Sequence, residues 1–113
     1  MNDQEIVQYA LANLQKTGKF EAKWLDNAPN EVLDGMINLT LNNRTIQLGI
    51  EIKKELRNIH LTKLEAFAKE YHPFMIVAQR IFPKIKQELR NRNIAYLEAN
   101  GNIYLNEKET FLW

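Results

Sequence analysis

The stretch Val32–Lys53, which reads VLDGMINLTLNNRTIQLGIEIK, decides the fold. Apolar residues alternate with polar ones on both sides of Asn42-Asn43, a pattern typical of two half-buried strands. Asparagine tolerates the positive φ that a two-residue turn requires. The alternating apolar residues are Ile37, Leu39, Leu41, Ile46, Leu48, Ile50 and Ile52. The stretch therefore predicts a β-hairpin that turns at the two asparagines.

A two-residue turn also fixes which residues of the two strands face each other. If Leu41 faces Arg44, apolar pairs fall on one face of the hairpin and polar pairs on the other. The same count sets Asp34 opposite Glu51, and Lys53 lies on the same face as Glu51. We therefore expect these three side chains to lie together.

Two opposed carboxylates repel each other, but a divalent cation between them reverses the sign of the interaction. Mg²⁺ binds one or two carboxylates, keeps several waters and accepts phosphate oxygens. The pattern thus indicates a metal and phosphate site, with Asp34 and Glu51 as metal ligands and Lys53 as a catalytic group that orients water or stabilises charge. The alternative is that Asp34 only starts a strand, and that the Glu and Lys keep an exposed strand soluble.

The composition indicates a single domain spanning residues 1–113. A net charge of +1 gives no global attraction to nucleic acid, so DNA binding would need a local patch. The chain has no cysteine, which excludes disulfides and thiolate metal sites and fits a cytoplasmic location. It has a polar N-terminus, unlike a signal peptide, and no apolar run of the ~20 residues that a membrane span needs.

The N-terminal segment predicts a helix over Asp3–Lys16, with an apolar stripe at helical spacing. Glu5 lies in its first turn, where a carboxylate favours the helix dipole. As an alternative, Glu5 points into the proposed site as a further acidic group. Lys19–Leu25 is either a short strand or a loop.

A strand–helix–strand unit follows the hairpin. Thr62–Tyr71 has the pattern of a helix capped by Thr62, and Phe74–Ala78 is a continuous apolar run typical of a strand buried on both faces. We expect this strand to lie parallel to the one that carries Glu51. Gln79 would emerge at its carboxyl end, where open α/β sheets bind ligands, and is a secondary site candidate.

A further helix is predicted from Pro83 to about Arg92. Its polar side carries the one basic cluster of the sequence, which consists of Lys84, Lys86, Arg90 and Arg92. Such a run is either a solvated face or a weak contact to nucleic-acid phosphates.

The sequence closes with a second hairpin. Ile94–Leu97 and Ile103–Leu105 flank Asn100-Gly101, a strong signal for a two-residue turn that would pair Leu97 with Tyr104. The apolar ending Phe111-Leu112-Trp113 leads us to expect a piece of a longer protein, with a second domain or a homodimer contact at this end.

The expected class is α/β, more narrowly α+β with a mixed sheet, in the order αβββαβ followed by a helix and a hairpin. This order, with Asp34 and then Glu51-Ile52-Lys53 on the next strand, resembles the restriction-endonuclease-like fold and its PD-(D/E)xK motif. Leu33 stands where the motif has Pro. The resemblance implies that Asp34 and Glu51 bind Mg²⁺ and that Lys53 assists phosphodiester hydrolysis in DNA.

A narrower resemblance covers most of the chain. Glu51–Leu56 and the later run FMIVAQRIFPKIKQELRNRNIAYLEANGNIYL resemble the nuclease-like part of abortive-infection type IV antitoxins, which are transcriptional regulators. Glu98 stands where that family usually has Asp. The resemblance implies a DNA-binding regulator with a partner toxin, although the winged-helix part of such regulators has no counterpart in this sequence.

Three hypotheses follow. The first is a nuclease-like binding domain of a DNA-binding regulator or antitoxin, with vestigial or no catalysis. The second is a Mg²⁺-dependent DNA endonuclease that uses Asp34, Glu51 and Lys53. The third is a partner-binding module in which the acidic pair has no role.

Overall fold

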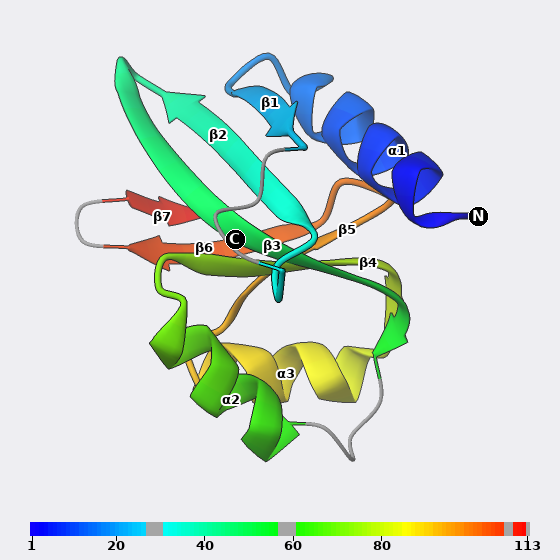
Figure 1. The fold of residues 1–113 in the computed structure, drawn as a ribbon. Helices are drawn as coiled ribbons and strands as arrows, with labels where there is room; N and C mark the ends of the chain where they lie inside the picture. Colours follow the sequence, from blue (N-terminus) through cyan, green and yellow to red (C-terminus); the bar gives the residue numbers. More distant parts are fainter. Residues whose placement is uncertain (27–30, 57–60, 108–109, 113) are drawn as a thin grey trace.

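The structure is a computed structural model that describes residues 1–26, 31–56, 61–107 and 110–112 (Figure 1). In chain order the elements are α1 (Asp3–Gln15), β1 (Glu21–Leu25), β2 (Gly35–Leu41), β3 (Arg44–Leu56), α2 (Leu61–Glu70), β4 (Phe74–Ile81), α3 (Pro83–Asn91), β5 (Ala95–Glu98), β6 (Ile103–Glu107) and β7 (Thr110–Leu112). The expected order is found from α1 to β6, and β7 is an additional strand.

The strands lie side by side in the order in which they occur in the sequence, from β1 to β7. Strand β4 runs parallel to both of its neighbours, β3 and β5, and the other pairs are antiparallel. The two parallel pairs are joined through α2 and α3, as strand–helix–strand units require. The molecule is therefore an α+β protein with a mixed sheet, which confirms the expected class at this level.

The central hairpin forms as its sequence predicts. Asn42 and Asn43 have φ values of 51° and 67°, so both occupy the left-handed region that a primed two-residue turn demands. Leu41 pairs with Arg44, and the pairing continues in step to Gly35 and Ile50. The predicted register is thus confirmed over β2.

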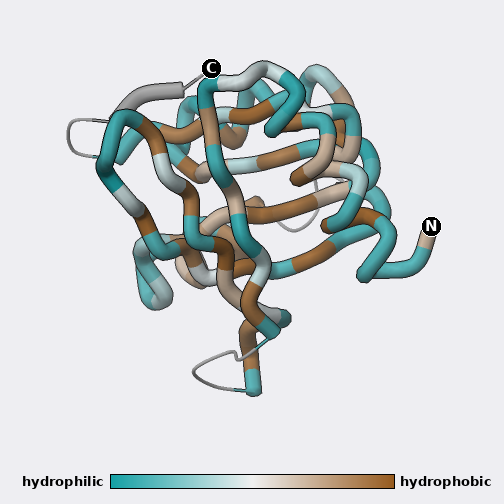
Figure 2. The backbone as a smooth tube through the Cα atoms, turned by 90° about the horizontal axis from the view of Figure 1, so that it is seen from above, coloured by the Kyte–Doolittle hydropathy of each residue, from teal (hydrophilic) through white to brown (hydrophobic). Residues whose placement is uncertain are grey.

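The helices cover both faces of the sheet (Figure 1). Helix α1 packs on one face, over a core that includes Ile6, Ile37, Ile50, Met75 and Leu97. Helices α2 and α3 cover the other face, over a core that includes Leu64, Ile76, Ile85, Leu89 and Tyr96. Figure 2 shows hydrophobic segments alternating with hydrophilic ones along the chain. Over the described ranges, no helix has the length and apolar character that crossing a bilayer needs.

Two element boundaries differ from the sequence-based expectation. Helix α2 begins at Leu61, so Thr62 lies inside the helix and does not cap it. Strand β4 extends to Ile81, because Glu55 and Leu56 of the long strand β3 continue to pair with it. Gln79 therefore lies within the strand and does not follow it.

The register of the second hairpin was predicted wrongly. The Glu98 amide donates to the Asn102 carbonyl at 2.9 Å, so three residues, Ala99 to Gly101, form the loop. Gly101 has a φ of 95°, the left-handed conformation that the last position of such a three-residue loop takes. The extra residue shifts the pairing by one, and Tyr96, not Leu97, pairs with Tyr104.

The turn geometry generates a test. Replacing Asn43 with Val forces a β-branched side chain into the left-handed region and should lower the free energy of unfolding by about 1–2 kcal/mol. Gln47→Val, on an exposed strand position of the same hairpin, should leave it unchanged or raise it slightly. Urea unfolding of both variants makes the comparison, and equal losses would contradict the turn assignment.

Candidate functional site

The regular pairing of β2 with β3 runs from the turn to Gly35, the residue that follows Asp34 in the sequence. The Asp34 amide donates to the Ile50 carbonyl at 2.8 Å, although Ile50 is already the partner of Gly35. Two residues on one side of the ladder, Asp34 and Gly35, thus oppose one residue on the other side, Ile50, which is the arrangement of a β-bulge. The Asp34 carboxylate then accepts a hydrogen bond from the Ile52 amide at 2.7 Å. In a continued ladder that amide would donate to the carbonyl of Leu33.

The bulge changes the face on which Asp34 lies. Asp34 lines a depression of about 460 Å³ beside α1, together with Trp24, Asp26 and Ile52. Leu33 takes the opposite direction and is buried in the core beneath α2 and α3. The prediction that Asp34 lies opposite Glu51 is therefore wrong, because a hairpin count without a bulge places the residues on the N-terminal side of Gly35 on the wrong face.

Glu51 and Lys53 lie together, as the sequence predicts. Their carboxylate and ammonium groups are 3.0 Å apart, and the two side chains are 22% and 45% exposed. They line a separate depression of about 320 Å³ beside α2, whose other lining residues are Leu56, Lys63, Leu64 and Phe67. This depression has an apolar floor and a rim that carries two lysines and one glutamate.

The arrangement does not fit a Mg²⁺ ion held between Asp34 and Glu51. These carboxylates line different depressions, and each already has a partner in Ile52 or Lys53. Across the described parts of the chain, no group of three or more His, Cys, Asp or Glu side chains is placed to hold a metal. No catalytic step is therefore derived through this ion.

The secondary candidates lie elsewhere. Glu5 belongs to a capping box: its carboxylate accepts from the Asn2 amide at 3.1 Å, and the Asn2 side chain accepts from the Glu5 amide at 2.9 Å. These two hydrogen bonds explain the position of Glu5 at the start of α1. Gln79 is exposed near the carboxyl end of β4 and is not a lining residue of either depression.

The basic cluster of α3 is largely engaged within the protein. Lys86 pairs with Glu98 at 2.6 Å, and Arg92 pairs with Glu65 at 3.0 Å. Arg90 donates to the Tyr96 hydroxyl at 2.8 Å. Lys84 is the member of the cluster that projects as an exposed cation. Most of the positive charge that the sequence places on this helix is thus used in packing α3 against its neighbours.

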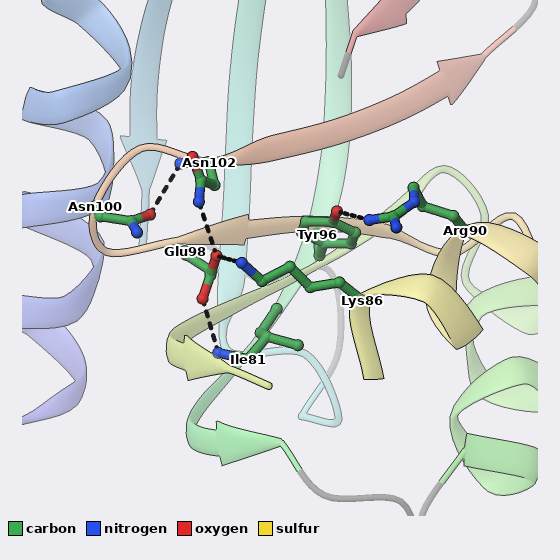
Figure 3. A network of polar contacts seen from close by, with 7 residues as sticks. All are labelled: Ile81, Lys86, Arg90, Tyr96, Glu98, Asn100 and Asn102. Atoms are coloured by element: carbon green, nitrogen blue, oxygen red, sulfur yellow. Dashed lines mark hydrogen bonds and ion pairs between the residues drawn. The ribbon is translucent and has the colours of Figure 1, made fainter. Parts of the chain in front are cut away.

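Glu98 lies at the centre of a polar network that the sequence did not predict (Figure 3). It is 3% exposed, and its carboxylate accepts from the Ile81 amide at 2.8 Å, from Lys86 and from the Asn102 side chain at 3.2 Å. A buried carboxylate is stable only with such partners. The sequence signal for this network is an acidic residue, Glu98, in the otherwise apolar strand β5, together with Lys86 on the preceding helix α3.

Comparisons of this chain with protein-family models, with curated proteins and with solved structures find no match. The function is therefore inferred from the geometry above and from the motif resemblance. Glu51 and Lys53 form an ion pair on the face that α2 covers, and Asp34 lies on the face that α1 covers. The buried Glu98 holds α3 through Lys86.

The bulge predicts a structural role for Asp34. Asp34→Ala removes the acceptor of the Ile52 amide and should lower the free energy of unfolding by about 1 kcal/mol. Asp34→Asn keeps a side-chain oxygen and should lower the free energy of unfolding by less than Asp34→Ala does. Glu31→Ala, an exposed acidic position three residues earlier, is the matched control and should change little. Thermal or urea unfolding measures all three, and an Asp34→Ala protein as stable as the control would contradict this role.

Proposed function

We propose that this chain is a restriction-endonuclease-like domain that acts as a binding module of a DNA-binding regulator or antitoxin and does not hydrolyse DNA. The order αβββαβ supports this assignment, as does the Glu51-Ile52-Lys53 sequence on the central strand β3. The resemblance of the segment from β4 to β6 to abortive-infection antitoxin regulators supports the regulator class.

The separation of Asp34 from Glu51 is the observation that carries the proposal. Metal-dependent phosphodiester hydrolysis by such a fold needs both carboxylates at one ion, so that the metal can polarise the phosphate and activate water. Here the bulge directs Asp34 toward α1, while Glu51 lies beside α2. Lys53 is paired with Glu51. The motif residues thus remain in the sequence without the geometry that hydrolysis requires.

The depression beside α2, which Glu51 and Lys53 line, supports binding of a phosphate backbone. Lys53 and Lys63 both line it, and Glu51 offsets one of their two charges. Both lysines come from regular elements, β3 and α2, which fix the positions of their backbone atoms relative to each other. Backbone contacts of this kind position a protein on DNA without reading its sequence. Through the resemblance alone, the reading of a DNA sequence is assigned to the winged-helix part of such regulators, and a toxin is proposed as a partner of the protein.

The absence of hydrolysis is testable with supercoiled plasmid. The chain should leave the plasmid intact in either Mg²⁺ or Mn²⁺, and Asp34→Ala and Lys53→Ala should give the same result. Agarose gels read the conversion to open circles. Nicking by the unchanged chain that either substitution abolishes would overturn the proposal in favour of the endonuclease hypothesis.

Backbone binding is testable by its salt dependence. Lys63→Gln should weaken the binding of short duplexes of unrelated sequence to a similar degree and should reduce the slope of log K against log salt by about 0.9. Lys19→Gln, an exposed lysine between α1 and β1, is the charge-matched control. Fluorescence anisotropy at several salt concentrations measures both variants. An equal change of slope in both would argue against contacts at the depression.

A further inference from the structure

An open groove runs beside α1, on the face of the sheet that this helix covers (Figure 1). It is the depression that Asp34 lines, and its volume is about 460 Å³. Its other described lining residues come from the N-terminal part of α1, from the end of β1 with the residue that follows it, and from β3. The groove shares no described lining residue with the depression beside α2, where Glu51, Lys53 and Lys63 lie.

The floor of the groove is apolar. Val7 and Leu11 of α1 belong to the core beneath this helix, and Trp24 and Ile52 are partly buried against the same core. The floor therefore continues the core to the surface and leaves apolar atoms of Trp24 and Ile52 in contact with solvent. An apolar surface with a polar rim is a common feature of sites that bind another molecule.

The indole of Trp24 is held in place from two sides. Its N–H donates to the carboxylate of Asp26. Its six-membered ring lies so close to Gly35 that a Cβ atom there would be 2.4 Å from two of the ring carbons. Gly35 thus allows the ring to pack directly on the start of β2. A side chain fixed in this way loses little conformational freedom when a ligand binds.

The groove is acidic, although the whole chain has a net charge of +1. Asp3, Asp26 and Asp34 line it, and its described lining residues include no Lys, Arg or His. Asp26 and Asp34 accept from neutral groups, the indole of Trp24 and the amide of Ile52, which leave the negative charges in place. No ion pair joins any of the three to a cation within the described residues. The N-terminus of α1 offsets about half a unit of charge, so the groove stays negative.

The charge and the floor together define the chemistry of the occupant. Carboxylates repel phosphate groups, so a nucleic-acid backbone is disfavoured. A single metal ion does not fit, because across the described ranges no three Asp, Glu, His or Cys side chains are placed to hold one. An ammonium or guanidinium on an aliphatic stem fits both features, since the stem packs on apolar surface while the head reaches the carboxylates. A head that lies over the ring of Trp24 also gains a cation–π interaction.

We propose that this groove docks a segment of a partner protein that presents lysine or arginine beside an apolar side chain. The three carboxylates come from three separate parts of the chain, the start of α1, the end of β1 and the residue before β2, so they can meet several basic groups along one segment. Charge complementarity of this kind selects the partner and its orientation. The proposal goes beyond the proposed function, and neither the plasmid result nor the duplex result affects it.

Nuclear magnetic resonance locates the binding. The ¹⁵N-labelled chain is titrated with a capped hexapeptide of alternating lysine and leucine and, separately, with the peptide in which glutamate replaces lysine. The indole N–H of Trp24 and the backbone amide of Ile52 should shift with saturation in the first titration only. The backbone amide of Lys63, beside the other depression, is the internal control and should stay in place. The absence of a saturable shift with the lysine peptide, or equal shifts with both peptides, overturns the proposal.

A double variant tests the charge without removing the hydrogen bond of the indole. Asp3→Asn with Asp26→Asn removes two charges of the groove and keeps an acceptor oxygen for Trp24. It should weaken binding of the lysine peptide about fivefold, because exposed charge pairs contribute little singly and two are lost here. Glu21→Gln with Glu70→Gln removes two exposed charges outside the groove and should change the affinity less than twofold. Thermal unfolding shows that each domain is intact, and equal losses overturn the proposal.

Two further probes test the apolar floor and the source of the cation. A hexapeptide of alternating lysine and serine keeps the charges but has no apolar side chain, and it should bind at least fivefold more weakly than the leucine peptide. Equal binding of the two would overturn the role of the floor and the proposal with it. Spermidine is a free polyamine with an aliphatic stem. If spermidine binds more tightly than the lysine peptide and loses affinity in the double variant, the groove belongs to a small polyamine and the partner-protein proposal is wrong.

Discussion

The hydrogen bond from the Ile52 amide to the Asp34 carboxylate sets the character of the central hairpin. It closes a β-bulge in which Asp34 and Gly35 share one partner, Ile50. One extra residue at this point reverses the faces of the two residues next to it, Asp34 and Leu33. Leu33 becomes part of the core beneath α2 and α3, and the Asp34 carboxylate joins the depression beside α1. The chemistry open to Glu51 and Lys53 therefore depends on this local break in the ladder.

The buried carboxylate of Glu98 has a comparable effect on the other face of the sheet. Glu98 connects the end of β4, helix α3 and the β5–β6 hairpin through the Ile81 amide, Lys86 and Asn102. The three-residue loop with Gly101 makes this possible, because it sets Glu98 and Asn102 opposite each other. Leaving such a carboxylate unpaired would be costly, so the position of α3 is tied to the hairpin. Both polar features arise from small departures from regular strand pairing.

The sequence predicted the parts of the structure that follow from periodicity. Alternation and the Asn42-Asn43 turn gave the register of β2 and β3, and the apolar run of β4 gave its parallel pairing. The proximity of Glu51 and Lys53 followed from spacing two apart on one strand. Alternation carries no information about where a ladder breaks, so the bulge at Asp34 was missed. For the same reason the sequence predicts a two-residue turn at Asn100-Gly101, where the structure has a three-residue loop, and it does not predict the Glu98 network.

The most direct measurement is the scalar coupling that passes through the hydrogen bond of the Ile52 amide. In uniformly labelled protein, long-range triple-resonance spectra identify the carbon whose oxygen accepts that proton. The bulge predicts a correlation from the Ile52 nitrogen to the side-chain carboxyl carbon of Asp34. A correlation to the backbone carbonyl carbon of Leu33 would show a regular ladder instead. It would place Asp34 opposite Glu51 and contradict the account of a nuclease-like domain without hydrolysis.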